Sequence, residues 1–231
     1  MKLTKKRKKA QEKMETGKAY SLAEAASLVK KVNTASFDAS VDLHIRLGVD
    51  PKKADQSIRG TVSLPHGSGK TKRVLVFCTP DQEKAAKEAG ADYVGLDEYL
   101  QKIEKDGWLD FDVVVASPAV MPKIAKLGRV LGPRNLMPNP KSGTVTDDIG
   151  TAVSEVKKGK VSFRIDKEGI VHSSVGRVSF SENQIAENAE ALIKTIEKMR
   201  PSSTKGNYMK SITMVSTMSP GIQVDVKTFS A

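Results

Sequence analysis

The alternation of hydrophobic and polar residues changes twice along the chain, and these changes predict its organisation. Before residue 67, a capping box at Ser21–Glu24 opens an amphipathic helix. The run Val41–Leu47 then alternates strictly between apolar and polar side chains, which predicts a half-buried strand. A second strand is expected near Gly60–Leu64. This first stretch therefore predicts a helix packed on an antiparallel sheet.

Between residues 67 and 159 the strands become continuous apolar runs that alternate with helical patterns. The expected strands are Arg73–Cys78, Tyr93–Val94 and Asp112–Ala116. The expected helices are Asp81–Ala89, Asp97–Lys105, Val120–Leu127 and Ile149–Lys158. Strands that alternate with helices in this way predict a parallel, Rossmann-like sheet.

After Gly159 the strictly alternating pattern returns. The runs Val161–Ile165 and Ile170–Val175 flank the turn residues 166–169 and predict a β-hairpin. A second capping box at Ser181–Gln184 opens a long helix that should end at Arg200-Pro201. Two further strands are expected near Tyr208–Thr217 and Gln223–Val226.

Antiparallel signals therefore lie on both sides of a parallel α/β block, and an insertion explains this order most simply. We predict an α+β domain formed by both chain ends, residues 1–66 and 160–231. An α/β domain of the Rossmann-like type, with a parallel sheet, is inserted as residues 67–159. The boundary sequence Gly67–Thr71 resembles a phosphate-binding P-loop, but Leu64 stands where that motif needs its first glycine. A strand rather than a helix follows it, so a hinge fits better.

The net charge of +11, with an isoelectric point near 9.6, favours a polyanionic partner, either nucleic acid or an anionic membrane. Residues 67–159 hold 14 basic and 13 acidic side chains, whereas the remainder holds 24 and 14, a net charge of +10. The cluster Lys5–Lys9 predicts a flexible phosphate-binding arm, with a solvated tail as the alternative. No stretch approaches the length of a membrane span, so a membrane partner is not expected.

Residues that could support catalysis or bind a metal are sparse. The single Cys78 rules out an internal disulfide, suits a reducing cytosol and lies in a buried strand. The histidines His44, His66 and His172 are far apart in sequence, so neither a metal site nor a cofactor is predicted, although convergence in space stays open. Both the Gly-x-Ser-x-Gly elbow and the Gly-x-Gly-x-x-Gly turn are missing. We therefore expect no enzyme activity; a nucleotide-dependent enzyme is the alternative.

The segment Leu127–Pro140 combines three prolines with Val130, Leu131, Leu136 and Met137. Its prolines lack the amide hydrogen that regular structure needs, and Gly128, Gly132 and Asn135 tolerate positive φ angles. We predict an ordered loop that contains neither helix nor strand.

That loop, with the preceding Val120–Lys126, resembles the signature of the large-subunit ribosomal protein family that builds the mobile stalk beside the tRNA exit site (ribosomal protein L-one, bacterial type). Three further stretches match the same family in the same order: Leu47–Gly60, Leu64–Gly67 and Ser216–Met218. Together they span nearly the whole chain. The sequence departs from the family at Asn135 and Ser219, where glycine is common, at Ser36, where lysine often precedes Phe37, and at Ile165, where asparagine is common.

The resemblance implies a set of functional residues. The rRNA-binding residues would be Phe37, Thr217, Met218, Ser219, Asp166, Lys167, Gly169 and His172. Arg129 and Arg134 would make a secondary, tRNA-facing RNA contact, and Gly67, Gly69 and Gly159 would serve as hinges between the domains.

The resemblance also implies a function in the cytoplasmic ribosome. The protein would bind large-subunit rRNA, assist the release of deacylated tRNA from the exit site, and bind its own operon messenger RNA to repress translation. It would be a monomer outside the ribosome. A general RNA chaperone, which would bind any RNA with similar affinity, is a further alternative.

Overall fold

The computed structural model of the protein describes residues 4–15, 17–204 and 206–229. The chain divides into two compact units, one drawn from Met1–Gly69 and Val161–Ala231 and the other formed by Lys70–Lys160. Each unit is built around its own buried hydrophobic residues. Helices combine with antiparallel and parallel sheets, which makes this a mixed α/β protein.

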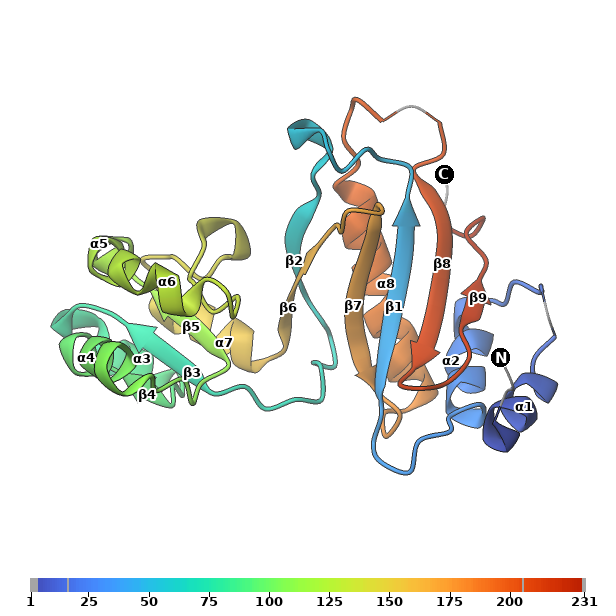
Figure 1. The fold of residues 1–231 in the computed structure, drawn as a ribbon, viewed down its shortest axis with the longest axis horizontal. Coiled ribbons are helices and arrows are strands. Elements are labelled where there is room, and N and C mark those ends of the chain that lie inside the picture. Colours follow the sequence, from blue (N-terminus) through green and yellow to red (C-terminus); the bar gives the residue numbers. More distant parts are fainter. Residues whose placement is uncertain (1–3, 16, 205, 230–231) are drawn as a thin grey trace. The chain divides into compact units, whose positions relative to one another are not determined.

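The first unit holds a four-stranded antiparallel sheet with the strand order β7-β1-β8-β9 (Figure 1). Strands β2 and β6 form a separate two-stranded sheet. In chain order its elements are α1 (Lys5–Glu12), α2 (Leu22–Lys31), β1 (Ser40–Leu47), the 3-10 turn η1 (Ala54–Gln56), β2 (Arg59–Ser63), β6 (Lys160–Arg164), β7 (Ile170–Arg177), α8 (Glu182–Lys198), β8 (Met209–Ser216) and β9 (Ile222–Val224).

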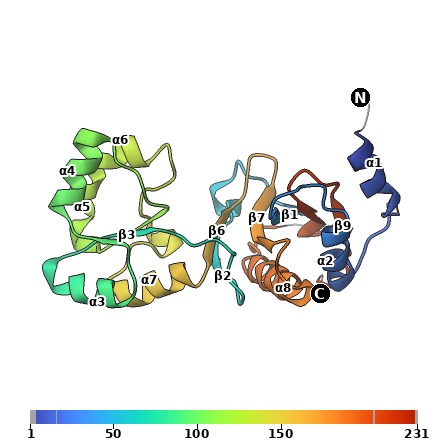
Figure 2. The ribbon, with the colours of Figure 1, turned by 90° about the horizontal axis from the view of Figure 1, so that it is seen from below.

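Strict alternation gives this sheet two different faces. Val41, Leu43 and Ile45 of β1 are fully buried, because helices α2 and α8 pack on that side (Figure 2). Both helices begin with the predicted capping boxes, at Ser21 and Ser181. We call the opposite side, whose side chains stay at least partly exposed, the open face. It carries Asp42, His44, Arg46, His172, Ser174, Thr213 and Val215.

The predicted hairpin of 161–165 with 170–175 is wrong. Strand β6 pairs with β2, and β7 pairs with β1, so the two segments lie in different sheets. The turn between them forms as expected, but only a single bridge joins Ile165 to Val171. Val171 and Val175 of β7 are fully buried in the same core as the apolar residues of β1, and pairing with β1 keeps this alternation in register.

The second unit has a parallel sheet with the order β4-β3-β5, as the middle of the sequence predicts. Helices α3 and α7 cover one face and α4, α5 and α6 the other (Figure 2). Its elements are β3 (Val74–Phe77), η2 (Pro80–Gln82), α3 (Glu83–Glu88), β4 (Tyr93–Val94), α4 (Asp97–Asp106), β5 (Val113–Ala116), η3 (Pro118–Val120), α5 (Met121–Ile124), η4 (Ala125–Leu127), α6 (Gly128–Leu131), η5 (Pro140–Ser142) and α7 (Ile149–Lys157).

The segment 127–140 is not free of regular structure, which corrects the sequence prediction. Gly128–Leu131 forms the short helix α6, because its residues precede the first proline and keep their amide donors. Leu131 is fully buried and fixes this turn to the core. Gly132 has an ordinary negative φ. A Cβ at this position would lie 2.6 Å from the Gly128 carbonyl oxygen, so only glycine fits against that carbonyl group. Asn135 alone takes the expected left-handed conformation, with φ 56°.

The basic N-terminal cluster also differs from expectation, because it is helical rather than a flexible arm. Thr4 caps helix α1 by accepting a hydrogen bond from the Arg7 amide at 3.4 Å. Ala10 is the buried residue of this helix, and Lys13 Nζ donates to the Lys31 carbonyl at 3.1 Å. These contacts attach the cluster to helix α2.

Candidate nucleic-acid interface

Two large apolar side chains from opposite ends of the chain are exposed in neighbouring loops. Phe37 is 54% exposed and Met218 is 76% exposed, whereas most large apolar residues of this unit are buried. The Thr34 hydroxyl donates to the Met218 carbonyl at 3.3 Å, and the Thr217 amide donates to the Ser40 carbonyl at 3.2 Å. The structure therefore brings the loop that carries Phe37 against the turn that carries Met218.

The backbone of this turn is unusual at Met218. Its φ angle is 67°, in the left-handed region that side chains other than glycine, asparagine and aspartate rarely adopt. The Ser219 amide closes the turn on the Ser216 carbonyl at 2.9 Å. Ser219 itself is not in the left-handed region, so replacing the family's common glycine by serine adds no backbone strain there. Strain at an exposed apolar residue is typical of a functional position.

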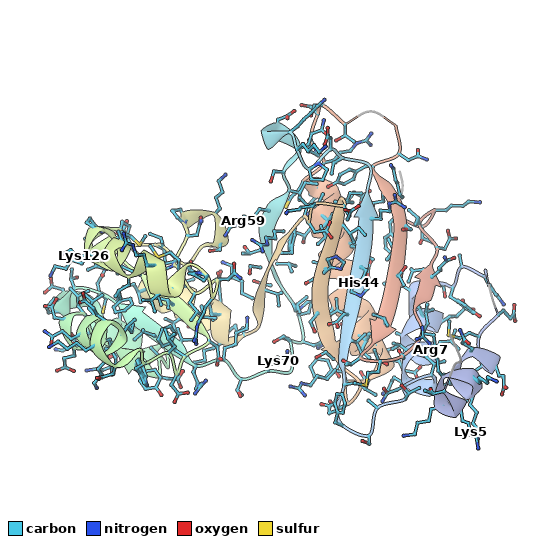
Figure 3. The ribbon with its side chains drawn as sticks, viewed as in Figure 1. Lys5, Arg7, His44, Arg59, Lys70 and Lys126 are labelled. Carbon is cyan, nitrogen blue, oxygen red and sulfur yellow. The ribbon has the colours of Figure 1, made fainter. Side chains whose placement is uncertain are left out.

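Two histidines and a carboxylate form a chain across the middle of the open face. His44 and His172 pair directly across β1 and β7, and their Nδ1 atoms lie 2.8 Å apart (Figure 3 shows His44). His172 Nε2 lies 3.1 Å from Asp166 Oδ2. A carboxylate only accepts, so His172 Nε2 carries the hydrogen, and its Nδ1 accepts from His44 Nδ1. Burial, and then the neighbouring His172, lower the pKa of His44.

The remaining predicted rRNA-binding residues lie at the other end of the same sheet. Asp166 accepts backbone hydrogen bonds from Glu168 at 2.9 Å and Ile170 at 2.8 Å, and the Ile170 contact is the first cause of its lowered pKa. Gly169 is buried, has φ +79°, and accepts from the Leu47 amide at 2.9 Å. Lys167 projects from the turn and is exposed.

Apart from His172, the predicted site residues of the first unit therefore lie in loops at the two ends of one sheet, as two groups. Phe37, Thr217, Met218 and Ser219 lie at one end, and the 166–169 turn lies at the other, roughly 20 Å away along the strands. His172 lies between them. A surface of this length suits an extended ligand better than a small molecule.

Arg129 and Arg134 lie in the second unit and are exposed. Within the described part of the chain neither makes an ion pair. Loop-stabilising ion pairs therefore do not explain these two arginines.

The predicted hinge glycines all have positive φ angles: 68° at Gly67, 69° at Gly69 and 102° at Gly159. Gly67 is also held from within its own unit. The buried Asn188 of α8 donates to the Gly67 carbonyl at 3.0 Å and accepts from the His66 amide at 3.0 Å. This anchor fixes the point at which the chain leaves the first unit.

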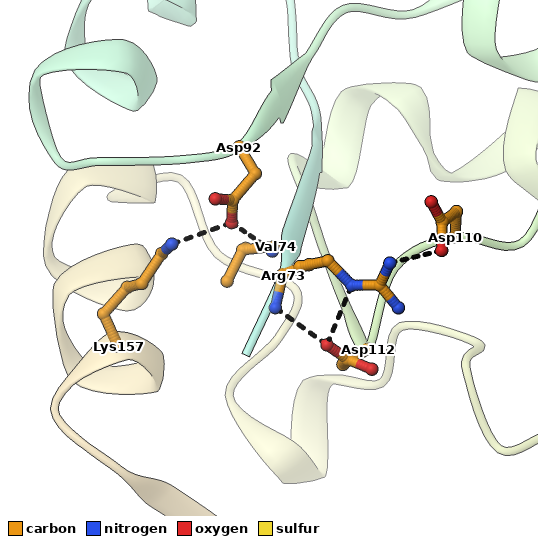
Figure 4. A network of polar contacts seen from close by, with 6 residues as sticks. All are labelled: Arg73, Val74, Asp92, Asp110, Asp112 and Lys157. Atoms are coloured by element: carbon orange, nitrogen blue, oxygen red, sulfur yellow. Dashed lines mark hydrogen bonds and ion pairs between the residues drawn. The ribbon is translucent and has the colours of Figure 1, made fainter. Parts of the chain in front are cut away.

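Charge is divided unequally between the units. Lys70–Lys160 contains 15 basic and 13 acidic side chains, and the remaining residues contain 23 and 14, so the first unit carries +9 of the net +11. In the second unit many charges neutralise one another. Figure 4 shows Asp92 accepting from Val74 N at 2.8 Å and Lys157 Nζ at 2.7 Å, beside Arg73 with Asp110 and Asp112. A polyanion would therefore be attracted mainly to the first unit.

Sequence reasoning missed several residues of this surface. The period-two pattern placed His44 on a polar face, but nothing in the sequence revealed its contact with His172. Asn33, Thr34 and Ser216 connect the Phe37 loop to the Met218 turn through hydrogen bonds. No local pattern marks these residues, because their contacts join positions more than 180 residues apart.

Other kinds of site find little support among residues 4–15, 17–204 and 206–229. Within these ranges no group of three or more metal-binding side chains converges, and His66 lies apart from the other two histidines beside Glu187. In the same part of the chain, no helix combines the length and apolar character that a membrane span requires.

The first unit combines most of the positive charge with an extended, polar sheet face and exposed apolar residues near one end of that sheet, which are features of a surface that binds a polyanion. Comparison with known proteins identifies the family. Residues 29–220 match the model of the ribosomal protein L1p/L10e family. The chain belongs to that family, which confirms the resemblance found in its motifs.

Individual relatives cover almost the entire chain. The protein is 64% identical over 227 residues to the large ribosomal subunit protein uL1 of Phocaeicola vulgatus, covering 98% of this chain and 97% of the relative. Identity to the uL1 protein of Bacteroides thetaiotaomicron is 63% over the same length and coverage. For the uL1 protein of Christiangramia forsetii it is 60% over 229 residues, 99% and 98% of the two chains.

Proposed function

We propose that the protein is a structural component of the large ribosomal subunit in the cytoplasm and binds large-subunit rRNA to form the mobile stalk. One observation carries this proposal. Phe37 and Met218, from opposite ends of the sequence, are exposed in adjoining loops at the end of a polar sheet face, in the unit that holds most of the positive charge. The names of the uL1 relatives support the ribosomal context.

The open face and the loops at its two ends each have a suitable chemical role in RNA binding. The Phe37 ring and the Met218 side chain can pack on ribose or base surface, since base–aromatic stacking contributes about 1–3 kcal/mol per base. The Thr217 hydroxyl and the histidine pair offer hydrogen bonds to 2′-hydroxyl and phosphate groups. Lys167, at the far end, offers a cation to the backbone. A protein that binds RNA through such contacts recognises the shape of the folded RNA rather than the base sequence of a duplex.

The finer functions follow from the family membership as proposals. The split unit of residues 1–66 and 160–231 holds the rRNA, and the inserted unit of residues 67–159 moves on hinges at Gly67, Gly69 and Gly159. That movement accompanies release of deacylated tRNA, which Arg129 and Arg134 contact. The same RNA surface binds the protein's own messenger and represses translation. The protein acts as a monomer outside the ribosome, without a cofactor.

Filter binding of the full chain to a stalk rRNA fragment, with bulk tRNA as competitor, tests this proposal. If 6–10 phosphates are contacted, affinity should fall roughly 10³–10⁵-fold between 50 and 200 mM salt, because counterions are released on binding. The rRNA fragment should outcompete tRNA strongly. Equal affinity for both RNAs would indicate a general RNA chaperone. Binding of ATP, GTP or NAD in equilibrium dialysis, without rRNA binding, would favour the nucleotide-dependent enzyme.

A further inference from the structure

A partly buried hydrogen-bond network lies beside the two exposed apolar residues and joins the segments that contain them. Ser216, at the end of β8, is fully buried. Its hydroxyl has two acceptors within reach, Ser219 Oγ at 2.8 Å and Asn33 Oδ1 at 3.3 Å. The Ser219 hydroxyl in turn accepts from the Ser216 amide at 3.0 Å and donates to the Ser216 carbonyl at 2.9 Å. The turn 216–219 is therefore fixed by side chains as well as by its backbone.

The network continues into the loop that presents Phe37. Asn33 Oδ1 also accepts from the Ala35 amide at 3.2 Å, and Asn33 Nδ2 donates to the Ala35 carbonyl at 3.4 Å. The far side of this loop is held separately. Asp38 accepts from the Ser179 amide at 3.0 Å and pairs with Arg177 at 3.4 Å. Phe37 thus lies in a loop that is fastened on both sides.

Stability alone does not explain this arrangement. An exposed methionine in the left-handed conformation lowers stability in two ways. Its backbone is strained, and its apolar side chain is in contact with water. Natural sequences keep such local conflicts at functional positions, where surrounding contacts hold the conformation. The hydrogen bonds among Ser216, Ser219 and Asn33 supply the contacts that hold the conformation of Met218.

We infer that Ser216, Asn33 and Ser219 are positioning residues, which hold Met218 and Phe37 on one rigid surface for RNA. This inference rests on the proposed rRNA binding. It adds Ser216 and Asn33, which act without touching the RNA, and it gives Ser219, already predicted as an rRNA-binding residue, a second part in fixing the turn. Ser219 has a specific part, because the glycine common in the family at this position would lack the hydroxyl that bonds Ser216. Preorganisation of this kind raises affinity by lowering the entropy lost on binding.

A double-mutant cycle on the full-length protein tests the inference. Ser216→Ala should weaken binding of the stalk rRNA fragment about fivefold to tenfold, the effect of losing one hydrogen bond. In a Met218→Ala background the same change should have less than about a twofold effect, since Ser216 acts through Met218. Ser216→Thr, which keeps the hydroxyl, should retain affinity, and Asn33→Ala should weaken binding from the other loop.

Ser173→Ala is the matched control. Ser173 is also a buried serine that faces the core of the same sheet, but its hydroxyl has no hydrogen-bond partner. This variant should bind RNA as the wild type does. The positioning role would be overturned if Ser216→Ala lowered RNA affinity equally in the wild-type and Met218→Ala backgrounds. It would also be overturned if neither Ser216→Ala nor Asn33→Ala lowered the affinity. If Met218→Ala also bound like wild type, the proposed rRNA surface itself would be wrong.

Discussion

At the scale of single residues, the His44–His172 pair gives the protein a defined response to pH. Burial and the neighbouring imidazole disfavour the charged form of His44, so its pKa in the folded state lies below the ordinary value of 6.5. The unfolded chain therefore binds more protons than the folded chain as the pH falls below about 6.5. The stability that neutral His44 contributes is complete above that pH and is lost as the pH falls through the folded pKa.

We predict that the free energy of unfolding decreases between pH 7 and pH 5.5 in the wild type and that His44→Gln removes this part of the decrease. Urea unfolding at a series of pH values measures it. Asp166 also has a lowered pKa, but its titration begins from 3.8 and lies below this window. Identical pH slopes in both proteins would show that His44 does not carry the effect.

The sequence indicated which residues could belong to the interface more readily than which of their side chains contact one another. The motif match pointed to Phe37 and Met218, and both are exposed, as an RNA-contacting role requires. Their roles stay predictions. The contact of His44 with His172, by contrast, depends on the register between β1 and β7. The alternating pattern excludes a one-residue slip, which would turn one histidine to the core side. A two-residue slip would keep both histidines on the open face but separate them, and no local pattern excludes that register.

At the scale of elements, local signals predicted helix starts well. Both capping boxes formed as expected, because they depend on residues only three positions apart. Strand partners depend on competition across the whole unit, which is why the 161–175 hairpin was wrong. The helix α6 was missed because we gave most weight to the three prolines of the segment 127–140, although its first six residues precede them and include the helix.

The positive charges of helix α1 destabilise the helix itself. Lys5, Lys6 and Arg7 occupy the first turn, where the helix dipole disfavours cations, and the first turn holds no acidic residue. Lys5 and Lys9 repel each other at i,i+4 spacing. Figure 3 labels Lys5 and Arg7 on this helix, and both residues are exposed. Such a helix should gain stability from any anion bound at its surface.

We predict that Lys6→Glu stabilises α1, because an acid in the first turn suits the dipole and faces Lys9. Amide exchange of Lys8, whose N–H donates to the Thr4 carbonyl at 3.0 Å, reports this directly. Exchange should slow by roughly two- to fivefold. In Lys6→Gln, which only removes the charge, the exchange rate of the Lys8 amide should lie between those of Lys6→Glu and the wild type. Unchanged or faster exchange in Lys6→Glu would show that charge does not limit this helix.

At the scale of the whole molecule, the chain divides into two compact units, with the divisions between Gly69 and Lys70 and between Lys160 and Val161. The domain boundaries expected from the change in hydrophobic pattern, at residues 67 and 159, stay a prediction. Patterning can reveal such a division because parallel and antiparallel sheets differ in burial, and therefore in sequence. Hinge motion at these points, and its coupling to tRNA release, stay proposals, since patterning carries no information on movement.

The central claim is that the two chain ends together form the rRNA surface around Met218. The most direct measurement is the affinity of Met218→Asp for the stalk rRNA fragment, with Met199→Asp as control. Met199, which is 38% exposed at the end of α8, is a second exposed methionine. We expect Met218→Asp to weaken binding on the order of a hundredfold, through lost packing and repulsion of phosphates. Met199→Asp should change affinity less than about twofold. Wild-type affinity in a folded Met218→Asp protein would contradict the account.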